Sequence, residues 1–227
     1  LAKNISMTMT PMVFTARMMK QADPDARMCF IGPCAAKKLE ANRKSVRSDV
    51  DYVLTFEELQ GMFDAKDIDF NTLEADPEDG LNEGTAMGRG FAVGGGVAAA
   101  VVEAISHIDP TREVKIEYGD GLRECKKMLM MAKAGKRNGY LLEGMGCPGG
   151  CINGGGQPIQ HAVVRNFVDL KERRAKALYE SDKNNAKRCS HENSAVKELY
   201  DEFLGEPGSH KAHEILHTTY VARKKYD

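Results

Sequence analysis

The chain has 227 residues, of which 42% are hydrophobic and 29% are charged, and its formal net charge is -1. The length suits one large or two small domains, and the ordinary apolar fraction argues against wholesale disorder. The near-zero charge excludes a general electrostatic attraction to nucleic acid or anionic membranes. The sequence has no run of about 18 apolar residues, so it predicts no transmembrane helix. We therefore expect a globular protein that binds neither nucleic acid nor a membrane.

The first third of the chain predicts helices that alternate with short strands. The apolar run at residues 28–31 stops at Gly32-Pro33, as is typical of a buried strand, and Thr55 can cap the helix after the second strand. In chain order we expect a helix at residues 11–20, strands at 28–31 and 51–54, a helix at 56–63, and an acidic, irregular loop with at most two short turns at 64–84.

The remainder of the chain repeats this alternation. Three consecutive glycines at 94–96 precede an apolar helix at 97–105, and a strand at 113–118, a helix at 122–134 and a buried strand at 140–142 follow. From about residue 160 the chain is helical and charged. Two strand–helix–strand blocks predict an α/β fold of two lobes, with mostly parallel sheets flanked by helices, and then a helical C-terminal tail.

Six cysteines lie at positions 29, 34, 125, 147, 151 and 189, too few for a compact disulfide-stabilised secreted scaffold. We expect a reduced, cytoplasmic compartment, where cysteines are buried, reactive or metal-bound. Cys34 and the pair Cys147 and Cys151 follow predicted strands, at the carboxyl ends where parallel sheets collect their chemistry.

The other candidate ligands are less informative. Cys29 is expected in the core, and Cys125 and Cys189 have no partner at a suitable spacing. Three histidines at positions 210, 213 and 217 are predicted to share one helical face. A solvated or hydrogen-bonded tail is favoured there over a metal site.

The segment 143–158 is the densest in glycine and allows three interpretations. A G-x-G-x-x-G pattern beginning at Gly144 matches a dinucleotide fingerprint, but Pro148 would interrupt the helix N-terminus that must hold the pyrophosphate. In the second interpretation, metal ligation, Cys147 and Cys151 lie four residues apart, and the glycines between them let backbone amides approach bound sulfurs. Structural zinc is the third, but the usual Cys-x2-Cys spacing is missing. A pair of turn cysteines without any metal is the plain structural alternative.

The cysteine motifs closely resemble those of the [FeFe]-hydrogenases. Residues 146–158, GCPGGCINGGGQP, resemble the family's third signature motif, and residues 33–40, PCAAKKLE, resemble the second, Pro-Cys-x-x-Lys-x-x-Glu. Residues 209–220 resemble the small-subunit-like tail that wraps the catalytic domain. The resemblance covers essentially the whole chain and implies a large-subunit catalytic domain at residues 1–160 and a helical tail at 161–227.

The resemblance also implies individual roles. Cys34, Cys147 and Cys151 would supply three of the four thiolates that hold a [4Fe–4S] cluster, and Cys151 would bridge to a two-iron subsite. Lys37 would hydrogen-bond a cyanide of the subsite, and Glu40 completes the second motif. Met145 would line the pocket, and Ser6 would serve in the proton relay.

The chain departs from the family pattern in three places. The first motif, Thr-Ser-Cys-Cys-Pro, would precede Leu1, and it supplies the fourth cluster ligand and the cysteine that exchanges protons with the subsite. Gly32 stands where the best-known members carry methionine, and residues 10–12 read Thr-Pro-Met where many members carry Ser-Pro-Gln. We therefore expect this chain alone to be inactive and metal-free as isolated.

The implied activity of the intact enzyme is 2H+ + 2e− ⇌ H2, with ferredoxin or a similar electron carrier as partner and with maturation enzymes that build the two-iron subsite. A hydrogenase-like iron–sulfur assembly protein or a hydrogen-sensing relative is the alternative. Lys37, Glu40 and the Gln157-Pro158 ending favour the enzyme, because an assembly factor needs no lining for the subsite.

Overall fold

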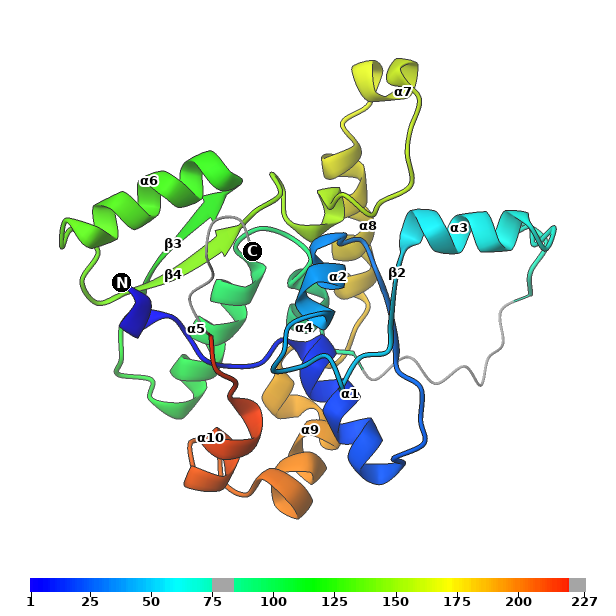
Figure 1. Cartoon of the computed structure of the whole chain (residues 1–227). Coiled ribbons are helices and arrows are strands. Elements are labelled where there is room, and N and C mark those ends of the chain that lie inside the picture. Colours follow the sequence, from blue (N-terminus) through cyan, green and yellow to red (C-terminus); the bar gives the residue numbers. More distant parts are fainter. Residues whose placement is uncertain (75–83, 221–227) are drawn as a thin grey trace.

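In the computed structural model, residues 1–74 and 84–220 are described, and their four strands form two separate parallel pairs. β1 (Cys29–Gly32) pairs with β2 (Tyr52–Thr55), and β3 (Lys115–Asp120) pairs with β4 (Tyr140–Met145). Figure 1 shows the pairs in different parts of the molecule, each with helices packed around it. The predicted α/β fold with parallel sheets and flanking helices is confirmed.

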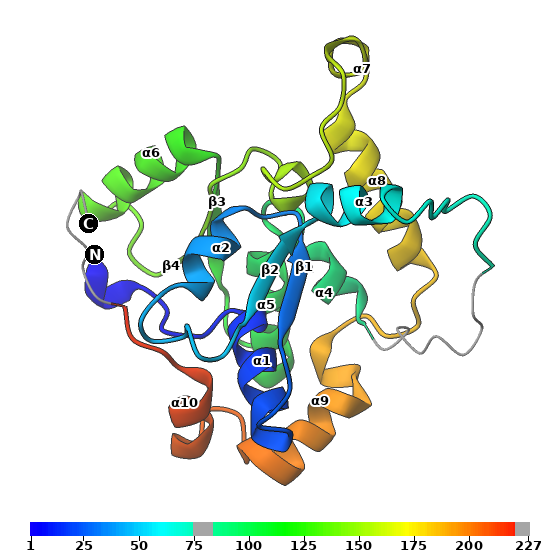
Figure 2. The same cartoon turned by 45° about the vertical axis from the view of Figure 1, so that its right-hand side comes forward.

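The β1–β2 pair lies against a small apolar core. Figure 2 shows β1 beside β2, with α1 (Pro11–Ala22) below them. The predicted helix at 11–20 is confirmed and is two residues longer, while both predicted strands occur one residue later than expected. The buried side chains of this core are Met9, Met12, Val13, Ala16, Ala41, Val46 and Val50.

The helix α3 (Phe56–Asp64) begins where the sequence predicts, because Thr55 caps it. The Thr55 Oγ1 accepts a hydrogen bond from the amide of Glu58, and the Glu58 carboxylate accepts one from the amide of Thr55, which together form a capping box. A hydrogen bond from Lys38, followed by those from the Thr55 amide and hydroxyl, lowers the pKa of Glu58 to about 2. The short helix α2 (Ala36–Ala41) was not predicted, since six residues show no apolar period.

The second lobe is built around β3 and β4. The helices α5 (Gly96–Ile108) and α6 (Leu122–Lys133) confirm the two predicted helices, and Figure 1 shows them on opposite sides of the strand pair. The predicted strand at 140–142 is confirmed as part of β4, but its expected burial was wrong, because those side chains are half-buried. The burial expected for the strand at 28–31 was also wrong, because Cys29 and Ile31 of β1 are exposed. Within the described residues β4 has a single neighbouring strand, so part of its surface is left open.

The C-terminal part is helical, as predicted. Its α-helices are α7 (Ala162–Phe167), α8 (Leu170–Lys183), α9 (Ser194–Leu199) and α10 (His210–Leu216). Short helical turns occur at Ala2–Asn4, Cys151–Asn153, Ser190–Glu192 and Tyr200–Leu204. The tail returns to the start of the chain, where the Met9 amide donates to the Leu216 carbonyl at 2.8 Å and Thr8 forms a bridge with His217.

A further short helix that was not predicted, α4 (Ala86–Gly90), precedes α5 in the chain and contacts α5 and α8. Of the irregular loop expected at 64–84, the described part after α3 contains only turns, and residues 75–83 lie outside the described residues. No helix among those that are described has the length and apolar character needed to cross a membrane.

Substitution of Thr55 tests the capping box. Thr55→Val keeps the side-chain volume but removes the hydroxyl, so we expect it to lower the free energy of unfolding by about 1 kcal/mol. Urea unfolding at neutral pH measures this change. Thr55→Ser, which keeps the capping oxygen, is the control and should retain most of the stability. Equal losses in both variants would show that packing, and not the cap, matters at this position.

Candidate functional site

The first cysteine turn follows β1 directly. The strand ends at Gly32, Pro33 and Cys34 form the turn, and α2 begins two residues later. The Lys37 amide donates to the Cys34 carbonyl at 3.3 Å, which returns the lysine to the same side as the cysteine, because residues three apart are neighbours on a helix. The Cys34 thiol is half-buried and free.

The second cysteine turn follows β4 and depends on glycine. Gly149 and Gly150 have φ angles of 85° and 89°, in the region that L side chains rarely adopt. A Cβ atom at Gly150 would lie 2.6 Å from the amide nitrogen of Gly94, so the turn is packed directly on the glycine loop that precedes α5. This conformation places Cys147 and Cys151 on the same turn.

Carboxylates hold this second turn in place. The Asp120 Oδ1 accepts a hydrogen bond from the Gly149 amide at 2.6 Å. The Glu143 carboxylate accepts two, from the Gly95 amide at 3.0 Å and the Ala98 amide at 2.7 Å, at the start of α5. Sequence reasoning missed both acids, although their places at the ends of β3 and β4 are the available signal.

The two turns meet where the glycine-rich segment crosses β1. The Gly156 amide donates to the Pro33 carbonyl at 3.0 Å, and a Cβ at Gly154 would lie only 2.1 Å from the same oxygen. The Glu57 amide of α3 in turn donates to the Gly156 carbonyl at 3.1 Å. The Cys147–Cys151 turn is thereby brought beside Cys34.

The environment of Cys151 includes the other two cysteines and Lys37. Burial raises the pKa of Cys151, the charges of Cys34 and Cys147 raise it further, and the ammonium of Lys37 opposes them. All six cysteines are free thiols. Within residues 1–74 and 84–220, no group of three or more His, Cys, Asp or Glu side chains is already arranged to hold a metal ion. Cys34 and Cys147 nevertheless both act on Cys151, and three soft thiols with the Lys37 ammonium are donors of the type that holds an anionic iron–sulfur cluster.

Lys37 and Glu40 form a connected polar chain. The Lys37 Nζ donates to the Glu40 Oε2 at 2.7 Å, and the two side chains are only 21% and 17% exposed. The other oxygen of Glu40 accepts a short hydrogen bond from the Thr10 hydroxyl. Thr10 lies at the N-cap of α1 without a side-chain capping bond, so its hydroxyl serves Glu40 instead. This role of Thr10 was not predicted.

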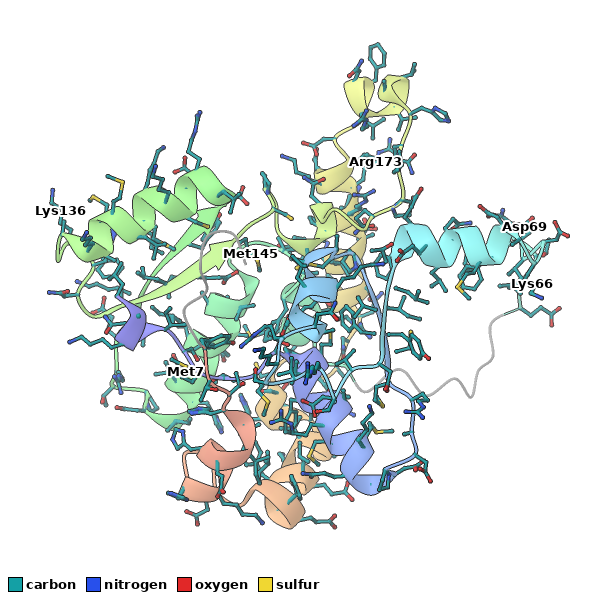
Figure 3. All side chains as sticks on the ribbon, in the orientation of Figure 1. Met7, Lys66, Asp69, Lys136, Met145 and Arg173 are labelled. Atoms are coloured by element: carbon teal, nitrogen blue, oxygen red, sulfur yellow. The ribbon has the colours of Figure 1, made fainter. Side chains whose placement is uncertain are left out.

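The remaining predicted site residues lie at different distances from the cysteines. Met145 is half-buried at the end of β4, next to the second turn, and Figure 3 labels it there. Ser6 is exposed, and its hydroxyl donates to the Thr8 hydroxyl at 3.0 Å. None of the hydrogen bonds found in the described part of the chain connects Ser6 to the thiols.

Two sequence interpretations change with the structure. Cys29 was expected in the core but is exposed, whereas the next residue of β1, Phe30, packs against the core cluster. The dinucleotide interpretation is disfavoured, since only the three-residue turn Cys151–Asn153 follows Gly149 and no α-helix N-terminus is presented there. Of the three C-terminal histidines, His213 and His217 approach within 3.3 Å, and His210 makes no such contact within the described residues.

Comparison with known proteins agrees with this geometry. Residues 1–155 match the family described as the iron-only hydrogenase large subunit, C-terminal domain, and residues 168–223 match the iron hydrogenase small subunit. The chain belongs to the iron-only hydrogenase family.

Individual relatives include both hydrogenases and assembly factors. The chain is 34% identical over 224 residues to the NADP-reducing hydrogenase subunit HndD of Solidesulfovibrio fructosivorans, covering 85% of this chain and 37% of that protein. It is 30% identical over 236 residues to a probable cytosolic Fe-S cluster assembly factor of Drosophila virilis, covering 86% of this chain and 48% of the relative. The chain therefore spans less than half the length of both relatives.

Solved structures extend the likeness to three dimensions. A variant of the apo [FeFe]-hydrogenase HydA1 from Chlamydomonas reinhardtii superimposes with a TM-score of 0.72 at 27% sequence identity. The match covers 96% of this chain and 70% of that one. The hydrogenase-domain fold thus extends over nearly the whole chain.

Neighbouring glycines provide a test of how the two turns dock. Gly154→Ala would drive a methyl group into the Pro33 carbonyl at 2.1 Å, so we expect a loss of roughly 1–3 kcal/mol in unfolding free energy. Gly155→Ala is the matched control, because a Cβ there meets nothing within 4 Å. Denaturant unfolding of both variants measures the difference. If Gly154→Ala were as stable as Gly155→Ala, the close approach of the turns would be refuted.

Proposed function

We propose that this chain forms the cysteine-bearing part of an [FeFe]-hydrogenase that interconverts protons and H2. The observation that carries the proposal is the meeting of the Cys34 turn with the Cys147–Cys151 turn beside Lys37. When bound, a [4Fe–4S] cluster with a two-iron subsite would supply the electron reservoir and the open iron site. Cys34, Cys147 and Cys151 would hold it.

The protein's own side chains would orient and protect this site. Glu40 fixes the Lys37 ammonium, and Thr10 in turn fixes Glu40, so the cation has one preferred position next to the cysteines. Preorganised donors of this kind stabilise anionic ligands without further rearrangement. Met145 would help to exclude water, and the hydroxyls of Ser6 and Thr8 would pass protons along the N-terminal segment.

An iron–sulfur assembly role is the second candidate function. It is supported by the resemblance to assembly factors such as the Drosophila virilis protein. The intact Lys37–Glu40 pair and the Gln157-Pro158 ending favour the hydrogenase, because a carrier of clusters alone needs no ordered cation for a two-iron subsite. A hydrogen-sensing relative would share these residues and would differ in turnover.

The proposal extends to the organisation and setting of the protein. We place the catalytic domain at residues 1–160 and the small-subunit-like tail at 161–227. Ferredoxin or a similar carrier would exchange electrons with the cluster, and maturation enzymes would insert the subsite. A reducing cytoplasm would suit the free thiols of all six cysteines.

Anaerobic reconstitution with iron and sulfide tests cluster binding. We expect the chain to take up a cubane-type cluster with a reduced-state EPR signal. Cys151→Ala should lose it, because the charges of both Cys34 and Cys147 act on Cys151. Cys125→Ala is the control, since that thiol bonds the Gly119 and Met145 carbonyls instead. If neither the chain nor a version extended by the family's first cysteine motif binds iron, the assignment fails.

The Lys37 ammonium separates the enzyme from the assembly protein. In the extended chain, matured with its two-iron subsite, Lys37→Met should keep the [4Fe–4S] EPR signal but reduce H2 evolution from reduced methyl viologen by at least about tenfold, the factor for one lost charge interaction. Lys44→Met, which removes a lysine outside both motifs, is the control. Full cluster loading without H2 evolution in the unsubstituted extended chain would favour the assembly role.

A further inference from the structure

A second group of side chains of the types that ligate metals shares no residue with the three-cysteine site. A cavity of about 180 Å³ lies between α4, α5 and the turn Ser190–Glu192. Cys189, Met87 and His191 line it together with small and apolar side chains, among them Ala100, Val101 and Ala104. The hydrogenase assignment gives these three side chains no role.

Backbone hydrogen bonds place these donors independently of any ligand. The amides of Ala86 and Met87 donate to the carbonyls of Lys187 and Arg188, both at 3.0 Å, which fixes the segment before Cys189 against the start of α4. The Glu192 carboxylate accepts from the Cys189 amide at 2.8 Å and holds the next turn. The thiol and the thioether thus face one another before anything binds.

The contacts within the group are those of potential metal ligands. The Cys189 thiol lies 3.9 Å from the Met87 sulfur, and Cys189 is only 8% exposed. The Nδ1 atom of His191 is buried and has no hydrogen-bond partner in the described structure. His107 stacks on His191 with ring centroids 3.8 Å apart and an interplanar angle of 3°, which fixes the plane of the imidazole.

We propose that Cys189, Met87 and His191 form a binding site for a monovalent soft metal ion, Cu(I). Two sulfurs bound to one metal at about 2.3 Å in a trigonal arrangement are about 4.0 Å apart, close to the separation observed. Thiolate, thioether and imidazole together are the ligands that select Cu(I). Binding replaces the thiol proton, which leaves to solvent.

Ligand type decides between copper and zinc. The thioether of Met87 is a soft ligand that selects Cu(I), whereas protein zinc sites take Cys, His and carboxylate ligands. Burial raises the pKa of the Cys189 thiol, and the charges of Glu103 and Glu192 raise it further, so without metal the group stays protonated. A cation that neutralises the thiolate removes this cost.

Anaerobic Cu(I) titration against a chromophoric chelator tests the site. The full chain is used with Cys34, Cys147 and Cys151 replaced by alanine, because those thiols would also bind Cu(I). One Cu(I) should bind per chain. Three variants, Met87→Leu, Cys189→Ser and His191→Gln, should each weaken Cu(I) binding by at least about tenfold, because the loss of even a residue that only supports a metal ligand has an effect of that size. X-ray absorption should show two sulfur ligands and one nitrogen ligand.

Matched controls separate ligation from general effects of substitution. The control variants replace a residue of the same type elsewhere in the chain. They are Met128→Leu at another buried methionine, Cys125→Ser at another partly buried thiol, and His161→Gln at another histidine. All three should leave the Cu(I) affinity unchanged. Should the triple-alanine chain not fold, Met87→Leu in the otherwise unaltered chain should lower tight Cu(I) binding by one equivalent. Undiminished binding in the three ligand variants, or a nitrogen- and oxygen-only spectrum, would overturn the proposal.

Discussion

The contact of the glycine-rich segment with the Pro33 carbonyl is the constraint on which the candidate site depends. Gly154 approaches that oxygen more closely than any side-chain-bearing residue could, and Gly156 donates a hydrogen bond to it. The two sheets share no strand, so this contact sets where the second cysteine turn lies relative to Cys34. The glycines here act by allowing close approach of two backbones, because the φ of Gly154 is -66° and needs no special freedom.

Two carboxylates, the exposed Asp120 and the half-buried Glu143, hold the second turn and the neighbouring start of α5. Asp120 and Glu143, from the ends of β3 and β4, accept backbone amide hydrogen bonds from the Gly149 turn and from the start of α5. A carboxylate at a helix N-terminus is stabilised by the helix dipole, which holds β4 and α5 together. The same negative charge of Glu143 adds slightly to the raised pKa of Cys151. The carboxylate of Glu143 thus holds the start of α5 and also disfavours the thiolate form of Cys151.

Local signals predicted the elements well, and contacts between distant segments escaped them. Thr55 caps α3 because a capping box requires only residues three apart, and both parallel pairs follow from short apolar runs that end at turns. The bond from Thr10 to Glu40 joins residues 30 apart, and nothing in either local sequence indicates it. The exposure of Cys29 was missed because a four-residue strand does not reveal which face the core will cover.

A bound iron–sulfur cluster would change the electrostatics of the three-cysteine site. Burial is the main cause of the raised pKa of Cys151, and repulsion from Cys34 and Cys147 adds to it. A bound iron–sulfur cluster would remove the thiol protons and replace repulsion by shared ligation, so its affinity would depend on pH. Since Cys34 and the Cys147–Cys151 turn belong to different lobes, the same ligation would cross-link the lobes. Binding of the cluster would then also stabilise the contact between the glycine-rich segment and Pro33.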